Sequence, residues 1–536
     1  MVAGSEKEQF RTMISTGEYY DVIDLIYSSY SIETLYEMGV VLDLTDLIEQ
    51  YMPNYVAFVN SNEELKMQAY TIIDGEKKML KIVGGGNDVT KTFEGYGYRR
   101  DWLVKYGVNP KTGEPFTGGY SAKTSDGKND PNSWSDNVMF PSWYDETNKY
   151  AVEYKANHPE WDGSNPIFIS DWEWMFGIFE KAFEDLGITD SYCMSIYYVG
   201  YMETGDMWSS FGGGSPLWSK KDGKLSFNAL TDSMKSYLEC MNNWYEKGWL
   251  DKRFNERSSD MFYSINQSAF RQGKVPVICA GLGNVGNNIE DSEYPLTDGI
   301  MLYPTKLPIN DLYGTEETKG KEPDALYQGT YATGSVAVTS NAKDKDLATL
   351  LTFIDYLYTE EGCKIAAMGL NKEQYEEIKD SLEKNSEGLD VMARFGLENG
   401  CYYVEDGKYY REKSIEDVNY LQLAVVADRI PIGIKMNDGV YVKNEITIKA
   451  WDEWMTWRDT ANVRNYSTFF SDDDSKVYTR VRNQINTKMS VEIPKFIKGE
   501  YNLDSDFDTF AKTINKMNAD KVTDLFAELF KKYGIS

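Results

Sequence analysis

Histidine and cysteine, which often act as general bases, nucleophiles and transition-metal ligands, are rare in this 536-residue chain. The chain has one histidine, His158, so a site built from several histidines is excluded, and a Ser-His-Asp or Cys-His arrangement would depend on that residue. The five cysteines form no CxxC pair, which predicts isolated buried thiols and neither a disulfide framework nor a zinc knuckle. These cysteines are Cys193, Cys240, Cys279, Cys363 and Cys401.

Carboxylates are abundant, with 85 Asp and Glu against 56 Lys and Arg, and the formal net charge is −29. Such a surface repels phosphate backbones and anionic lipid headgroups, so we expect no nucleic-acid partner. The charge also disfavours polyanionic ligands, although Arg99 and Arg100 could form a local positive patch. A glycosidase needs two opposed carboxylates. No motif singles out such a pair, and a carbohydrate-active enzyme stays open as an alternative.

Nucleotide and calcium motifs are incomplete. The sequence GLGNVGNN, which follows the apolar run 275–281, matches neither GxGxxG nor GxxxxGK[ST]. The Asp-rich segment 125–136 lacks the spacing of an EF-hand loop. We therefore predict no cofactor and no bound metal.

Aromatic residues are unusually frequent, with 40 Tyr and 13 Trp. Near the expected ends of strands and helices they interleave with Asn, Asp, Glu and Gly. A neutral sugar needs this combination, because its C–H faces stack on rings while its hydroxyl groups need donors and acceptors. A role in the core is an equally open interpretation for each ring. On this basis we predict ligand contacts at Tyr27, Trp172, Tyr197, Tyr198, Trp208, Trp218, Asn284 and Tyr331.

Two of these positions have a specific local argument. A helix is predicted over 170–187, begun by a capping box of Ser170 and Glu173, and Trp172 lies in its first turn away from the apolar stripe. We therefore expect Trp172 to be displayed as a stacking platform. Trp208 precedes the sequence FGGG, whose glycines would let a ligand approach the backbone.

The elements that would position these groups are clearest in the segment 329–370. Residues 335–339 (SVAVT) predict a buried strand, and the spacing of Leu347, Leu351, Ile354 and Tyr358 predicts a docked helix that ends at Gly362. Ligand sites in α/β folds form where loops meet the ends of such strands. Further strands are expected at 20–25 and 275–281, and further helices at 31–38, 45–52 and 234–248. A strand that leads into a helix is expected over 98–106. We also expect hairpins about Asp222-Gly223 and Asp406-Gly407, and two helices at the C-terminus.

Five blocks, in order, resemble the large lipoprotein subgroup of extracellular solute-binding proteins, the carbohydrate receptors of ABC importers. The blocks are residues 13–25 (MISTGEYYDVIDL), 39–55 (GVVLDLTDLIEQYMPNY), 98–110 (YRRDWLVKYGVNP), 333–362 and 496–533.

The resemblance implies an α/β, two-lobed, type II periplasmic-binding-protein-like fold with hinge crossovers. Since members carry a signal sequence, a lipid anchor and a first strand-helix-strand unit before the first block, we expect this N-terminal part to be missing here. We expect residues 1–100 and 265–340 in the first lobe. The second lobe would hold 101–264 and 341–536, with the C-terminal helices packing back across the hinge. Arg99 would lie near the cleft, because its segment crosses between lobes in the family.

The implied function is a non-enzymatic extracellular receptor, anchored as a lipoprotein, that captures a sugar or oligosaccharide and delivers it to ABC transporter permease subunits. We expect a monomer. A peptide-binding receptor is the second alternative.

Overall fold

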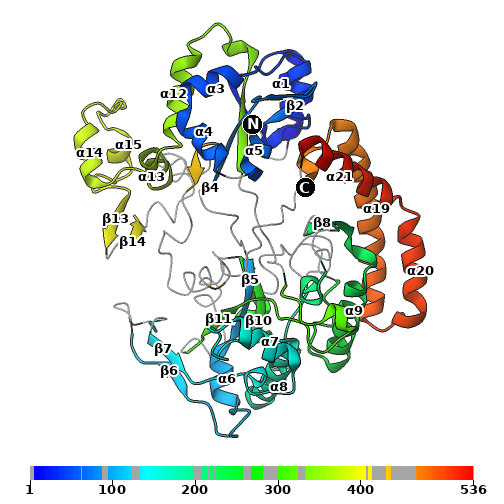
Figure 1. Cartoon of the computed structure of the whole chain (residues 1–536). Helices are drawn as coiled ribbons and strands as arrows, with labels where there is room; N and C mark the ends of the chain where they lie inside the picture. The colour runs from blue at the N-terminus through cyan, green and yellow to red at the C-terminus, as the bar shows by residue number, and fades with distance from the viewer. Residues whose placement is uncertain are drawn as a thin grey trace.

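The computed structural model describes residues 5–61, 63–86, 94–123, 127, 129–130, 133–196, 207–213, 217–221, 224–256, 267–281, 299–323, 332–405, 408–412, 430–435, 453 and 466–534. They form two bodies, each built on its own β-sheet, and a group of C-terminal helices that runs along one side of both (Figure 1). This is the two-lobed α/β architecture expected from the sequence.

The N-terminal body is built on a four-stranded sheet. The strand order is β1 (Val22–Asp24), β12 (Ala332–Val338), β4 (Ile82–Gly86) and β15 (Ile434–Lys435). All neighbours are antiparallel except β15 and β4. The helices of this body are α1 (Glu6–Thr16), α2 (Ile32–Glu37), α3 (Thr45–Tyr51), α4 (Pro53–Asn60), α5 (Glu63–Ala69) and α12 (Leu347–Tyr356), and a hairpin of β2 (Thr71–Ile73) and β3 (Glu76–Lys78) flanks them.

Two buried tyrosines hold the central strand β4 against the helices. The backbone N–H of Val83 donates to the Tyr55 hydroxyl at 3.2 Å, and the Tyr358 hydroxyl donates to the Val83 carbonyl at 2.6 Å. The predicted stripe of α12 is confirmed at Leu351 and Ile354, which are buried in this core.

The expected end of α12 at Gly362 is wrong. The helix ends at Tyr356, and Gly362 lies inside the next helix, α13 (Glu360–Met368), where its N–H donates to the Thr359 side chain that caps that helix. A Cβ on Gly362 would lie 1.9 Å from the Tyr356 carbonyl oxygen. The glycine therefore permits a close helix-to-helix turn. After α13 follow α14 (Lys372–Ile378), α15 (Val391–Arg394) and the predicted hairpin of β13 (Tyr402–Glu405) and β14 (Lys408–Arg411).

The second body is built on a three-stranded antiparallel sheet in the order β10 (Val277–Gly281), β5 (Glu94–Arg99) and β11 (Leu302–Thr305). Its main helices are α6 (Arg100–Tyr106), α7 (Lys149–Asn157), α8 (Ile169–Leu186), α9 (Asp232–Lys247) and α10 (Gln267–Arg271), with hairpins β6–β7 (Gly118–Tyr120, Trp134–Asp136) and β8–β9 (Trp218–Lys221, Lys224–Phe227). The capping box expected at Ser170 and Glu173 is wrong. Helix α8 begins one residue earlier, Asp171 is the residue that accepts from the Phe168 N–H, and the Ser170 hydroxyl donates to Asp311.

The C-terminal helices are α19 (Asp472–Ile497), α20 (Leu503–Asn515) and α21 (Ala519–Tyr533). Buried residues of α19 recur every four positions at Val481, Ile485, Met489 and Ile493, and this stripe packs on α9 of the second body. At its other end, Asp472 accepts hydrogen bonds of 2.7 Å from the Ser31 N–H and the Thr34 hydroxyl of α2. Helix α19 therefore contacts both bodies (Figure 1).

The lobe boundaries expected from the sequence need correction in three segments. Strands β5 and β10 lie in the sheet of the second body, apart from the sheet of β1, β12 and β4, whereas we expected residues 1–100 and 265–340 in the first lobe. Helix α12 packs on α3 and α4 of the N-terminal body, whereas we expected 341–536 in the second. The local patterns that predicted these elements do not specify which sheet each one joins.

Candidate functional site

A cavity of about 600 Å³ lies where the N-terminal body meets the C-terminal helices. This volume falls within the roughly 300–1,000 Å³ of small-molecule sites. Its lining residues are Leu25, Ile26, Ser28, Tyr30, Ser31, Ile32, Glu33, Gln68, Tyr70, Thr71, Lys81, Val83, Gly334, Ser335, Phe469, Phe470 and Tyr533. Phe470 also belongs to the hydrophobic core shared by the second body and the C-terminal helices, so the C-terminal part that completes the lining also packs on the second body.

The chain forms the first wall of the cavity by turning sharply after β1. The Asp24 carboxylate accepts from the Ile26 N–H at 2.9 Å and caps a short 3₁₀ turn over Leu25–Tyr27. The Ser28 hydroxyl donates to the Tyr30 carbonyl, and the Ser31 hydroxyl accepts from the Thr34 N–H at the start of α2. Local side-chain caps therefore fix the backbone that borders the cavity.

Glycines on the two central strands let another segment lie close to the sheet beside the cavity. A Cβ at Gly334 would lie 2.8 Å from the Pro431 Cβ, and one at Gly84 would lie 2.6 Å from the Ile432 Cα. Contacts this short would force the 431–432 backbone away from the sheet. Gly334 therefore helps to shape the wall that it lines.

The lining combines rings with hydrogen-bonding groups. The rings are those of Tyr30, Tyr70, Phe469, Phe470 and Tyr533. The polar side chains of Gln68, Thr71, Lys81 and Ser335 come from α5, β2, the residue before β4, and β12. This pairing of aromatic faces with fixed donors and acceptors can bind a polyhydroxylated molecule.

Of the described residues that line the cavity, two are charged, and their surroundings differ. Glu33 pairs with Lys532 of α21 at 3.0 Å. For Lys81 the structure shows no ion pair or hydrogen bond with any other residue that it describes, and desolvation lowers the pKa of its ammonium group to about 8. Burial, with the nearby Glu33 carboxylate, raises the pKa of Tyr533 to about 12, so that ring stays uncharged at neutral pH.

Of the predicted ligand residues, Tyr27 lies beside the cavity but faces elsewhere. Its ring packs against the cluster that contains Phe10, Ile14 and Ile23, while the next residue, Ser28, lines the cavity. The turn that contains Tyr27 therefore borders the cavity, while its ring packs in the core, because neighbouring residues of a tight turn point in different directions.

The expectation that Trp172 is displayed is wrong. Trp172 is 0% exposed and packs edge-on against Tyr96 and Phe176. Trp208 is also 0% exposed, and a Cβ at Gly213 would lie 2.5 Å from its Nε1 atom, so that glycine makes room for the indole ring.

Trp218 is likewise a core residue in this structure. It is 4% exposed and packs on Phe227, Tyr478 and Phe526, and its Nε1–H donates to Thr523 at 3.2 Å. Its ring joins the β8–β9 hairpin to helices α19 and α21. Contact of these three tryptophans with a ligand has no support from their surroundings.

The possible positive patch at Arg99 and Arg100 is neutralised. Arg99 is 2% exposed, donates from Nε to Asp101 at 2.8 Å and lies over the Trp102 ring. Arg100 is bound by both oxygens of Asp136 at 2.9 and 2.7 Å. Neither guanidinium is displayed to an anion. The remaining predicted ligand residues, Tyr197, Tyr198, Asn284 and Tyr331, lie outside the described residues.

Sequence reasoning missed Lys81, although a signal was present. Lys81 interrupts the apolar run Met79–Val83 (MLKIV), whose other four members are at most 1% exposed. A lysine inside such a run is rarely buried unless it has a partner or a function.

Comparison with solved structures identifies the fold. An extracellular solute-binding protein from Bifidobacterium longum subsp. infantis is 14% identical, with a TM-score of 0.61 over 99% of this chain and 90% of that one. The chain has the fold of the extracellular solute-binding proteins. A second solute-binding protein from that species, described as HMO-binding and ABC-transporter-associated, is 15% identical (TM-score 0.57, 99% and 91%). The Streptococcus pneumoniae substrate-binding protein FusA, solved as an EF-hand mutant with fructo-nystose, is 14% identical (TM-score 0.55, 98% and 90%).

No protein-family profile matches this solute-binding-protein-like chain, and no curated protein matches it at the sequence level. Within the described ranges, none of the helices combines the length and apolar character that crossing a lipid bilayer requires. The same residues contain no group of three or more His, Cys, Asp or Glu placed to hold a metal ion. All five cysteines are buried, as predicted, and none of them forms a disulfide.

Proposed function

We propose that this protein is a substrate-binding receptor that captures a sugar or oligosaccharide between its two bodies and delivers it to an ABC importer. The cavity carries the proposal, because the N-terminal body and the C-terminal helices that pack on the second body line it together. A ligand held by both sides binds the closed arrangement more tightly than the open one. That difference in affinity is what shifts the population toward closure.

The chemistry of the lining supports a saccharide ligand. Three tyrosines, two phenylalanines, an amide and several hydroxyl groups line one cavity. The proteins with the same fold also support it, since one is described as HMO-binding and another was solved with fructo-nystose. The low identities make these ligands a guide to the class of substrate alone.

A receptor fits the cavity better than a glycosidase does. Glycoside hydrolysis requires two carboxylates about 5–10 Å apart across the scissile bond. Glu33 is the one carboxylate among the described residues that line the cavity, and it already pairs with Lys532. A peptide-binding receptor remains the second candidate, because rings and an amide would also accommodate a peptide.

We further propose an extracellular location, anchorage as a lipoprotein and action as a monomer with permease subunits. Proteins of the same fold that are described as extracellular or ABC-transporter-associated support the location and the transporter partner. The anchor and the monomeric state extend the family resemblance found in the sequence.

Isothermal titration calorimetry against a panel of mono- and oligosaccharides tests the proposed function. We expect a Kd in the micromolar range, about −8 kcal/mol, and unchanged saccharides on chromatography after overnight incubation. Heat with peptides alone would favour the second candidate, and cleaved oligosaccharides would favour an enzyme.

A further inference from the structure

Among the described residues that line the cavity, one charged group has no counter-charge. Lys81 lines it, and no ion pair or hydrogen bond joins its ammonium group to another residue in the described part of the chain. Glu33, the carboxylate in the same lining, is held by Lys532 at 3.0 Å. The other titratable side chains that line the cavity are Tyr30, Tyr70 and Tyr533. Burial raises the pKa of both Tyr70 and Tyr533, so these two rings are neutral at pH 7.

A partly desolvated ammonium group without a partner is costly, because it has lost part of its water and gained no anion in return. Desolvation lowers the pKa of Lys81 to about 8, yet at pH 7 the group is still mostly protonated. A ligand that supplies one negative charge would remove this penalty. A neutral sugar could accept a hydrogen bond from Lys81 and would leave the charge unbalanced.

Uncharged polar groups around Lys81 could complete an anion site. Thr71 and Gln68 are 3% and 8% exposed, and Ser335 lies beside them in the lining. Within the described residues, none of these three side chains is engaged in a side-chain hydrogen bond. Their hydroxyl and amide groups can therefore donate to anionic oxygens that pair with Lys81.

We propose that the cavity binds a saccharide that carries a single negative charge, a carboxylate or a sulfate ester, with Lys81 as the counter-charge. This inference rests on the proposed function and names its substrate class. A single charge matches the single lysine, whereas a dianionic phosphate ester would leave one charge unbalanced. A polyanionic chain would also be repelled by the net charge of −29. Arg99 and Arg100 do not offset this charge, because they pair with Asp101 and Asp136.

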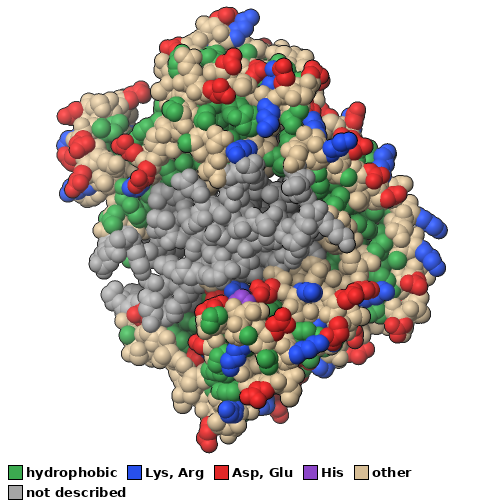
Figure 2. Space-filling view, viewed as in Figure 1, with side chains coloured by type: hydrophobic (Ala, Val, Ile, Leu, Met, Phe, Trp, Pro, Cys, Tyr) green, Lys and Arg blue, Asp and Glu red, His purple; other side chains and the backbone are tan. Residues whose placement is uncertain are grey.

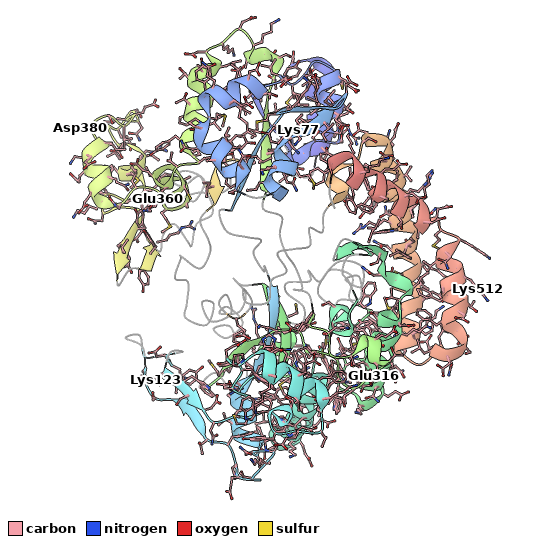
Figure 3. All side chains as sticks on the ribbon, in the orientation of Figure 1. Lys77, Lys123, Glu316, Glu360, Asp380 and Lys512 are labelled. Atoms are coloured by element: carbon pink, nitrogen blue, oxygen red, sulfur yellow. The ribbon has the colours of Figure 1, made fainter. Side chains whose placement is uncertain are left out.

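Matched pairs of saccharides test the proposal by calorimetry at pH 7. A disaccharide ending in glucuronic acid is compared with the same disaccharide ending in glucose, and galactose 6-sulfate with galactose. We expect one of the acidic sugars to bind at least tenfold more tightly than its neutral partner. Lys81→Met should remove that preference, and Lys81→Arg should restore part of it. The control is Lys512→Met on the outer helix α20 (Figure 3), which should keep the wild-type preference.

Proton uptake on binding separates a direct ion pair from a purely structural role of Lys81. At pH 8.5 roughly three-quarters of a group with a pKa near 8 is neutral. Binding of an anion should therefore take up close to that fraction of a proton, measured by repeating the titration in buffers of different ionisation enthalpy. At pH 6.5 the uptake should vanish, and Lys81→Met should show none at either pH.

Three results would overturn the proposal, and they affect the proposed function differently. Equal binding of acidic and neutral sugars, unchanged in folded Lys81→Met and Lys81→Gln, would refute the acidic class and leave the sugar receptor intact. Binding of acetate or succinate without any saccharide would refute both the saccharide class and the proposed function. Binding of no compound on the panel would likewise refute both.

Discussion

Replacing Lys81 with methionine should stabilise the protein in the absence of ligand. Methionine keeps the unbranched stem and removes the charge, and therefore the desolvation penalty that lowers the lysine pKa from 10.5 to about 8. One pKa unit corresponds to about 1.4 kcal/mol, so the full penalty is about 3 kcal/mol. Because Lys81 is half-buried and keeps some solvent access, we expect a gain of about 1–3 kcal/mol in the free energy of unfolding at pH 7.

The pH dependence gives this prediction a specific signature. Between pH 8 and 10.5 the folded state binds fewer protons than the unfolded state, so wild-type stability should rise with pH across this window. The penalty is fully present below pH 8 and is lost above about pH 10.5. The advantage of Lys81→Met should therefore shrink steadily across the same interval.

Urea denaturation of both proteins at pH 7, 9 and 10.5, followed by tryptophan fluorescence, measures this difference. Lys512→Met, on an exposed helix face (Figure 3), controls for the general effect of removing a lysine from an acidic protein. A destabilised Lys81→Met variant, or a gain that does not depend on pH, would refute the view that Lys81 is a desolvated, unpaired ammonium group.

Three further substitutions test the surroundings of the site. Trp218→Ala should lower the free energy of unfolding by about 3–5 kcal/mol, because it removes a buried ring, and should change the saccharide affinity of the folded protein by less than about twofold. A large loss of affinity without destabilisation would instead indicate that Trp218 contacts the ligand. Arg100→Met should lower the free energy of unfolding by about 3–5 kcal/mol, because it leaves the buried Asp136 carboxylate without its counter-charge. The double variant Arg100→Met/Asp136→Asn should recover part of that stability, and equal losses in the single and double variants would contradict the pairing. Asp472→Ala should cost about 1–2 kcal/mol, since it strips two donors of α2 of their acceptor; a change below about 0.3 kcal/mol in urea titrations would show that this contact between α19 and the N-terminal body is dispensable.

Elements with a strong local pattern were predictable from the sequence. The strand that contains Val336 and Val338 and helix α9, which ends at the left-handed Gly248, form as expected because their apolar spacing and end signals are local. Helix α2 likewise begins at its predicted Ser31 cap. The assignment of segments to lobes failed because nothing local in β5 or β10 indicates that they form a sheet of their own, apart from β1, β12 and β4.

The candidate site was less predictable, because it depends on which side chains become buried. Trp172 lies in the first turn of helix α8 and Trp208 in a short 3₁₀ helix, where exposure was a reasonable expectation, yet tertiary contacts bury both completely. Acidic and basic side chains are spread over the visible faces of both bodies (Figure 2). The negative net charge of the chain therefore does not reveal where a local positive charge lies. The lysine within the run MLKIV was the informative residue, and only the fold shows that it lines a cavity.

A crystal structure of the protein with a saturating saccharide tests receptor function most directly. We predict that the sugar occupies the cavity, stacks on Tyr30, Tyr70 or Tyr533, and contacts residues of both the N-terminal body and the C-terminal helices. A sugar bound elsewhere on the surface, or one held by a single body while the other stays apart, would contradict capture between the two bodies.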